Sequence, residues 1–393
     1  MIPVLDLVHV SALADAEREL GQLAHRHPVI RTRQANGAEA WTVLGASLSR
    51  KLLGDPRLSN DLHAHAPGAA QNPGAPIVLF EQDNPDHARY RRLVSAAFAS
   101  RAVRALEPRL VDIARRLLDG LPREGTADFI AAFANPFPLE VICELLGVPL
   151  SDREVFHTRV KNMDSPSAPV RRAATDAFAA YCTNLVEAKR QQPTEDLLSE
   201  LVTVRLDDGA SLTQDELVGF GSVLLFAGHV TTAFVIASAL LELLTHPDQL
   251  AALRADPSLV TGTTEEAMRF RGSLLSTTNR VALADIEADG VVIRRGDLVR
   301  FLLSAANRDP AVREDPHTFD ILRPTSAHLG FGHGPHFCLG HQLARQEIRV
   351  ALTEVLSRFP VLELAVPPRD LRWRSSDFLR GLAGLPVRYA AGS

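Results

Sequence analysis

The chain contains 393 residues, and its 42 Lys and Arg residues against 47 Asp and Glu residues give a formal net charge of −5. With 46% apolar residues the composition is that of a globular protein, and without a basic excess the chain gives no reason to expect nucleic acid or an anionic membrane as partner. Three cysteines are too few for a disulfide framework, which favours a reducing, cytoplasmic environment.

The first structural signal along the chain is a β-hairpin. Residues 28–33 and 40–44 are strand-like runs, and the Asn36-Gly37 pair between them favours a tight turn with positive φ angles. Residues 62–76 are rich in Gly and Pro and predict a loop. From about residue 86 to residue 270 the hydrophobic spacing is mostly helical.

A basic pair opens this helical region. His87 and Arg91 are four residues apart and therefore lie on one helix face. They predict either an ordinary exposed basic helix or a pair of donors for a buried anion.

A long uncharged segment follows, because residues 217–241 contain no Asp, Glu, Lys or Arg and are numerous enough to span a bilayer. Several Gly, Ser and Thr residues lie within it, a capping box at 213–216 precedes it and His246-Pro247 ends it. We therefore predict a buried core helix and no membrane partner. Ala227-Gly228 at its centre would let a flat group or dioxygen approach the backbone, and Thr231 can bond back to a helix carbonyl.

Beyond this helix, Glu266 and Arg269 are spaced to pair on one helix face, although such pairs are usually solvated. Residues 280–303 alternate as short strands around Asp289-Gly290. A last long helix is predicted at about 340–359, followed by a β-like tail.

The most informative segment is 331–340, which reads Phe-Gly-His-Gly-Pro-His-Phe-Cys-Leu-Gly. Three Gly and one Pro predict a compact, irregular loop that ends where the last long helix begins. Cys338 would then feel the positive end of the helix dipole, which favours its thiolate. The cysteine could be a buried structural residue, a nucleophile with His336 or His341 as base, or a haem ligand.

The same segment resembles, position for position, the Phe-Gly-x-Gly-x-His-x-Cys-x-Gly signature of the cytochrome P450 superfamily, most closely its soluble bacterial branch. The resemblance implies that Cys338 is the proximal thiolate on the iron of haem b, where it favours O–O cleavage. It also implies a single domain over residues 1–393 with a mainly α fold and small β-sheets (α+β). The haem would lie between the long central helix and the helix after the cysteine loop.

Other matches to the family appear in the family's order along the chain. Glu266, Arg269 and Arg323 match a buried ion network that holds the haem-side core together. His87, Arg91, Arg280 and His336 match donors to the haem propionates. The remaining haem contacts that the resemblance implies are Phe98, Ala227, Gly228, Thr231, Gly330, Phe331, Gly332, Gly340 and Ala344.

One departure concerns proton delivery. The family pattern Ala-Gly-x-(Asp/Glu)-Thr-(Thr/Ser) corresponds to residues 227–232, so Thr231 matches the threonine that helps to protonate bound dioxygen, while Val230 replaces the acid. His229 or a substrate group could take over the relay. Alternatively, the chemistry ends at hydrogen abstraction and gives oxidative coupling or ring closure, or the enzyme is a slow or peroxide-driven variant.

The resemblance implies a monooxygenase that uses dioxygen and electrons from a ferredoxin and its NAD(P)H-linked ferredoxin reductase, because no flavin or nicotinamide domain fits beside a haem domain in 393 residues. Arg101, Arg104 and Arg345 are candidates for the ferredoxin surface. Two other hypotheses are a non-catalytic haem-binding recruitment protein and a colourless enzyme with a cysteine nucleophile.

The expected substrate is a small organic molecule, free or bound to a carrier protein or peptide, in natural-product biosynthesis. Ser276, Thr277 and Thr278 argue against a purely hydrocarbon substrate. The predicted pocket residues are Val223, Phe226, Leu275, Thr278 and Phe378.

Overall fold

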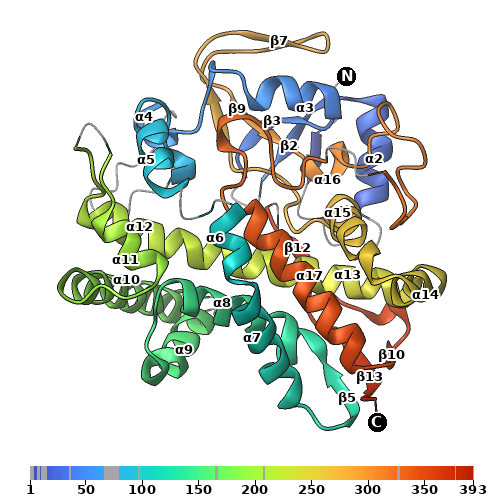
Figure 1. The fold of residues 1–393 in the computed structure, drawn as a ribbon. Helices are drawn as coiled ribbons and strands as arrows, with labels where there is room; N and C mark the ends of the chain where they lie inside the picture. Colours follow the sequence, from blue (N-terminus) through green and yellow to red (C-terminus); the bar gives the residue numbers. More distant parts are fainter. Residues whose placement is uncertain are drawn as a thin grey trace.

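The computed structural model is mainly helical, with short strands gathered near both ends of the chain (Figure 1). It describes residues 4–6, 9, 16–34, 37–65, 79–95, 98, 100–163, 167–206, 209–324, 328–376 and 378–392. The α-helices are α2 (Ala16–Arg26), α3 (Ala46–Leu53), α4 (Leu62–His65), α5 (Asp86–Ser95), α6 (Ser100–Ala105), α7 (Glu107–Asp119), α8 (Pro136–Leu145), α9 (Arg153–Met163), α10 (Ala168–Gln191), α11 (Leu197–Thr203), α12 (Gln214–Leu225), α13 (Thr231–Thr245), α14 (Pro247–Ala255), α15 (Val260–Arg271), α16 (Leu303–Ala306) and α17 (His341–Arg358).

Four small sheets accompany the helices, which confirms the expected α+β class. The largest sheet has the strand order β1-β2-β3-β9-β6-β4, so strands from the start of the chain pair with strands beyond residue 280. The other sheets have the orders β10-β13-β5, β11-β12 and β7-β8. The strands are β1 (Val4–Asp6), β2 (Val29–Arg33), β3 (Glu39–Val43), β4 (Leu58–Ser59), β5 (Glu124–Asp128), β6 (Arg280–Ala282), β7 (Ile286–Ala288), β8 (Val291–Ile293), β9 (Leu298–Phe301), β10 (Val361–Leu364), β11 (Trp373–Ser375), β12 (Arg380–Leu382) and β13 (Pro386–Ala390).

Antiparallel strand pairs flank both Gly positions that the sequence marks, Gly37 and Gly290. Strands β2 and β3 pair antiparallel, and Gly37 between them has φ 82°; Asn36 lies outside the described residues. Strands β7 and β8 also pair antiparallel, and Asp289 and Gly290 have φ angles of 48° and 75°. Two successive positive φ angles are those of a type I′ turn, which matches the twist of a hairpin.

The long uncharged segment forms the central helix of the protein. Helix α12, the π-helical turn η5 (Phe226–Val230) and α13 follow one another and cross the middle of the molecule, where α17 packs against α13 (Figure 1). The capping box is formed: the Thr213 N–H donates to Glu216 Oε2 at 2.8 Å, and the Glu216 N–H donates to Thr213 Oγ1 at 3.2 Å. Gln214–Thr245 is long and apolar enough to cross a membrane. However, 65% of its most apolar stretch of 18 residues is buried, which favours the predicted core helix.

Two predictions about the fold need correction. The region predicted as mostly helical contains strand β5, an exposed edge strand without alternating apolar residues that pairs with β13 near the C-terminus. Its conformation depends on that distant partner, which local spacing does not show. In the predicted 62–76 loop, residues 62–65 form the short helix α4, and the rest lies outside the described residues.

Candidate active site

The cysteine loop has the compact shape that its glycines predict. Gly332 and Gly334 have φ angles of 73° and 76°, a region that residues with side chains rarely adopt. The Cys338 N–H donates to the carbonyl of Phe331 at 2.9 Å and closes the loop. Helix α17 begins three residues later at His341, with Gly340 at its N-cap.

The protonation state of Cys338 differs from the sequence-based expectation. Burial raises the pKa of the thiol, and the opposing effects of the Gly340 N–H and of Arg91 and Arg345 do not compensate for it. The protein by itself therefore favours the thiol. A cation bound to the sulfur is needed to hold the thiolate, as a metal ion does.

Neither candidate base is bonded to this sulfur. Asn60 donates from Nδ2 to Nε2 of His336 at 2.9 Å, and Nδ1 of His341 donates to the backbone carbonyl of Cys338 at 3.0 Å. Among the residues that the structure describes, no histidine is hydrogen-bonded to Cys338 Sγ. The geometry thus gives no support to a cysteine nucleophile activated by His336.

Instead, His336 belongs to a cluster of basic side chains. Its ring lies 4.1 Å from the ring of His87, at an angle of 32°. Burial and the nearby His87 and Arg280 lower the pKa of His336 to about 3, and burial and Arg91 lower the pKa of His87. Burial likewise lowers the pKa of Arg280 to about 10, against the opposing effect of Asp83. A further anion nearby would raise the pKa of each of these groups and favour its charged form.

The cluster passes a simple test for a bound carboxylate. Nε2 of His87 is buried and has no hydrogen-bond partner within the described part of the chain, although buried polar atoms are normally paired. Arg280, also buried, donates from Nη1 to the carbonyl of Leu53 at 2.8 Å. A haem propionate would supply the missing acceptor, so the residues present fit a haem ligated by Cys338.

Arg91 contacts the cysteine loop directly, and its predicted contact with a haem propionate stays a prediction. Its Nη1 and Nη2 donate to the carbonyls of Pro335 and Phe337 at 3.0 and 2.7 Å. These bonds join α5 to the cysteine loop, so the structure shows Arg91 supporting the loop that carries Cys338.

Arg345 is likewise held by internal contacts. Its guanidinium lies 4.4 Å from the ring centroid of the buried Phe331 and donates to both oxygens of Glu265, at 2.6 and 2.9 Å. Burial raises the pKa of Glu265, but the bonds from Arg345 and His328 outweigh it and lower the pKa to about 2. Arg345 is therefore only partly exposed, whereas Arg101 and Arg104 on α6 are exposed, and the ferredoxin surface stays a prediction.

The central helix departs from α-helical geometry at the predicted place. Thr231, directly after the π-helical turn, donates from Oγ1 to the carbonyl of Ala227; Ala227 is exposed and Thr231 is partly buried. Gly228 instead packs against α8, since a Cβ there would lie 3.3 Å from Ile142 Cδ1. Helix α8 fills the space on the side where a side chain at position 228 would project. The expectation that a flat group approaches the backbone at Gly228 is therefore wrong on that side.

His229 is buried, and its Nε2 lies 3.1 Å from the carbonyl oxygen of Asn135. Residues two apart on a helix project to nearly opposite sides, so His229 points away from Thr231. The structure does not bring it to the proposed relay position.

The other expected haem contacts lie around the same region of the fold. Phe98 is buried and meets Phe220 edge-on, with ring centroids 6.2 Å apart. Gly330 is tightly packed, because a Cβ there would lie 3.0 Å from the Met268 carbonyl. Gly340 faces open space, and Ala344 of α17 is partly buried.

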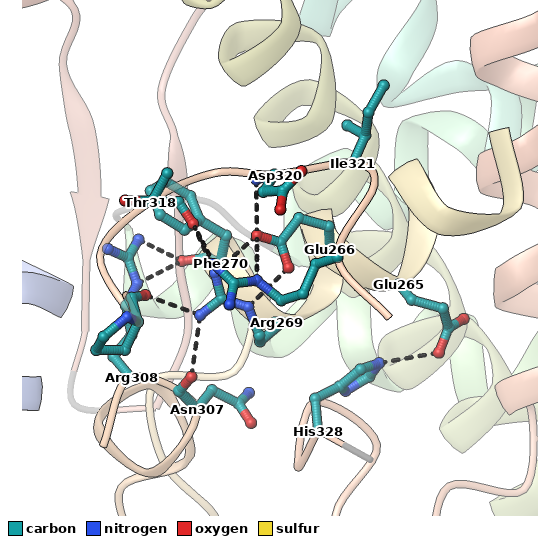
Figure 2. A network of polar contacts seen from close by, with 12 residues as sticks. Glu265, Glu266, Arg269, Phe270, Asn307, Arg308, Thr318, Asp320, Ile321 and His328 are labelled. Atoms are coloured by element: carbon teal, nitrogen blue, oxygen red, sulfur yellow. Dashed lines mark hydrogen bonds and ion pairs between the residues drawn. The ribbon is translucent and has the colours of Figure 1, made fainter. Parts of the chain in front are cut away.

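The ion network is formed as the resemblance implies (Figure 2). Arg269 donates from Nε and Nη2 to the two oxygens of Glu266, both at 2.7 Å, and both side chains are buried. Arg323 Nε approaches Glu266 Oε1 at 3.5 Å, and the Asp320 N–H donates to the same oxygen at 2.9 Å. Arg269 also donates to the carbonyls of Asn307, Pro316 and Thr318.

The predicted pocket residues are brought together only in part. Leu275 is buried in a small apolar cluster with residues of α2 and α16, so its placement in a pocket is wrong. Ser276 accepts from Arg300 Nη2 at 2.6 Å, and Thr277 Oγ1 accepts from the Phe301 N–H at 3.1 Å, so neither indicates substrate polarity. Val223, Thr278 and Phe378 are partly buried; Phe226 lies on the π-helical turn, and its side chain is not among those described.

Sequence reasoning missed a buried acid on α17. Glu347 is buried, and its Oε2 has no hydrogen-bond partner among the described residues. Burial raises its pKa well above the ordinary 4.5, which favours the neutral form of this carboxyl in the folded protein. The sequence of the helix is equally compatible with an exposed residue at position 347. Only the apolar residues that surround Glu347 at helical intervals could have suggested its burial.

Glu347→Gln is expected to flatten the pH dependence of stability. As pH rises above 4.5, the carboxyl ionises in the unfolded chain but retains its proton to higher pH in the folded protein. Unfolding then releases a proton, so the free energy of unfolding falls as pH rises. The slope approaches about 1.4 kcal/mol per pH unit for one group. Urea denaturation between pH 5 and pH 8 measures it, and equal slopes in wild type and variant would contradict the assignment.

Comparison with known proteins places these features in a wider group. Residues 154–380 match the family described as "Cytochrome P450". The chain is 41% identical to "Cytochrome P450 monooxygenase PikC" of Streptomyces venezuelae, over 99% of this chain and 95% of that protein. Among solved structures, the ligand-free P450 monooxygenase TamI is 40% identical with a TM-score of 0.90, covering 98% of this chain and 94% of that one. The P450 enzyme CxnD, "for C-S bond formation in chuangxinmycin biosynthesis", is 35% identical with a TM-score of 0.90, covering 100% of this chain and 99% of that one.

Proposed function

Since the chain belongs to the cytochrome P450 family and is therefore an oxidoreductase with a cysteine-ligated haem, we propose that it inserts oxygen into a small organic substrate in bacterial natural-product biosynthesis. The observation that carries this proposal is the full-length similarity to a monooxygenase combined with the partly buried Thr231 beside the π-helical turn. Hydroxylation or epoxidation is the reaction that we favour. The whole chain, residues 1–393, would form one catalytic domain in the cytoplasm.

The residues around the haem have separate tasks in this proposal. Cys338 would ligate the iron, and His87, His336 and Arg280 would hold the propionates through charge-assisted hydrogen bonds. The bound haem supplies reductive activation of dioxygen, and electrons would come from a ferredoxin and its NAD(P)H-linked reductase. Thr231 would hold a proton at Oγ1, and Phe331 and Phe337 would keep water away from the sulfur.

The substrate class can be found with the protein itself. We expect one of four classes (macrolides, terpenes, aromatic polyketides or peptides) to shift the Soret band of the holoprotein to high spin by displacing water from the iron. A Soret band that no free compound shifts would favour a substrate bound to a carrier protein. A preparation without any haem band would contradict the proposed function.

One specific observation favours a second candidate reaction. Val230 stands where the family has an acid, and His229 is bonded to Asn135 rather than directed at Thr231. Without an acid at this position, substrate oxidation could end in bond formation without oxygen insertion. One solved relative is named for C–S bond formation, which supports this second candidate.

Val230→Glu distinguishes the two reactions. If oxygen insertion is limited by the missing acid, the variant is expected to raise dioxygen consumption and hydroxylated product, by up to about 10²-fold, the lower range for general acid catalysis. Val230→Gln is the matched control, with the same size and no ionisable proton. Unchanged oxygen consumption and product in the glutamate variant would make Val230 incidental.

A further inference from the structure

Two π-helical turns lie next to helix α8. One is η3 (Ile130–Ala134), which directly precedes α8, and the other is η5 in the central helix. Such turns are rare, contain one extra residue compared with an α-helical turn and often occur at functional sites. Because a π-helical turn is less stable than an α-helical one, contacts from outside the helix must hold it in place.

His229 connects the two turns. Its side chain projects from η5, is 4% exposed, and donates from Nε2 to the carbonyl of Asn135 at 3.1 Å. Asn135 ends η3, and its own N–H donates to the carbonyl of Ile130 at 2.9 Å, which is the hydrogen bond that defines a π-helical turn. The His229 imidazole is therefore hydrogen-bonded to the residue that closes η3.

The neighbouring residue adds a steric contact on the same element. Any side chain at position 228 would reach Ile142 of α8, and Gly228 lets the two helices approach. Together, the packing at Gly228 and the hydrogen bond of His229 attach η5 to the segment that runs from η3 into α8.

The opposite side of the central helix carries Ala227, which is exposed, and Thr231, which is partly buried. Ala227 and Thr231 are four residues apart and joined by a side-chain hydrogen bond, and His229 between them points to the other side of the helix. Any rotation of η5 that breaks the bond to Asn135 must also turn the Thr231 hydroxyl. The two sides of the turn are thus mechanically linked.

We propose that His229 is a positioning residue whose hydrogen bond to the Asn135 carbonyl holds η5 in its π-helical form and thereby orients Thr231. It acts as a donor at Nε2 and does not pass protons to the oxygen chemistry. This inference rests on the proposed function in assigning a task to Thr231, and it replaces the relay that the sequence suggested for His229.

The test uses the holoenzyme and two substitutions. His229→Gln keeps an N–H donor on a side chain of similar reach but cannot titrate, whereas His229→Phe keeps a ring and has no donor. Hydrogen–deuterium exchange is measured in peptides that cover residues 130–135 and 226–231. Product formed per NAD(P)H consumed is measured across pH 6 to 8.

We expect the phenylalanine variant to exchange at least tenfold faster in both peptides and to lose coupling several-fold. The glutamine variant should match wild type in exchange, coupling and pH profile. Wild-type exchange in the phenylalanine variant would overturn the proposal, and so would a glutamine variant that loses coupling as completely as the phenylalanine variant. If the phenylalanine variant does not fold, His229→Leu replaces it as the variant without a donor. Exchange does not require turnover, so it tests the inference even if the proposed oxygen insertion is wrong.

Discussion

Arg269→Ala is expected to lower the free energy of unfolding by about 3–5 kcal/mol, the usual result of removing one partner of a buried ion pair. Arg269 and Glu266 are both almost fully buried and share two hydrogen bonds of 2.7 Å. Without the guanidinium, the partners left to the Glu266 carboxylate among the described residues are the Asp320 N–H (Figure 2) and the more distant Arg323. The backbone carbonyls of Asn307, Pro316 and Thr318 each lose the bond from Arg269 as well, although Thr318 keeps one from Arg323 Nη2.

Since globular proteins are stabilised by only about 5–15 kcal/mol, this loss should sharply reduce the yield of folded holoprotein. Urea denaturation followed by circular dichroism measures the change. Arg269→Lys should give an intermediate loss, because lysine keeps the charge but cannot form the two-pronged contact.

The matched control is Arg115→Ala on α7. Arg115 also binds a glutamate through two contacts, to Glu354 of α17, but it lies at the surface with 62% of its side chain exposed. Exposed ion pairs contribute little to stability, so this variant should unfold close to wild type. An Arg269→Ala variant as stable as the control would show that the network is not needed for stability.

The contrast between predicted and observed features follows the range of the interactions. The capping box at 213–216, the turn at Asp289-Gly290 and the glycines of the cysteine loop act within a few residues, and the structure shows each of them as expected. Strand β5 and the buried Leu275 depend on partners far along the chain, and both were misjudged. Hydrophobic periodicity predicts which face of a helix is buried, but it does not predict which element packs against that face.

The same reasoning explains the errors within the site. Motif matches identified Arg91 and His229 as residues near the reaction centre, and Arg345 was a candidate for the ferredoxin surface. Whether each one faces a ligand or the protein depends on neighbours that no motif contains, such as the Phe337 carbonyl, Glu265 and the Asn135 carbonyl. The buried Glu347 was missed for the same reason.

Cys338→Ser is expected to abolish the thiolate-type Soret band of the ferrous carbon monoxide complex and to reduce substrate oxidation by more than about 10²-fold. Substitution of residues that only support a metal ligand already costs 10–100-fold, and the thiolate itself supplies the electron density for O–O cleavage. Because the protein surroundings raise the pKa of this thiol, a hydroxyl, which is harder still to deprotonate, should bind the iron weakly. Haem content is measured alongside activity, so that loss of haem is distinguished from loss of the ligand.

The other two cysteines provide the control for this experiment. Cys143 and Cys182 are buried on α8 and α10, and neither lies in the cysteine loop before α17. Cys182→Ala should keep the normal Soret band and activity. A colourless wild-type protein that iodoacetamide inactivates at Cys338 would instead support the nucleophile hypothesis, even though the structure brings no base to that sulfur. A red protein whose thiolate band disappears only with Cys338 would assign the iron to this residue, and the basic cluster of His87, His336 and Arg280 would then have the carboxylates of the same haem as its partners.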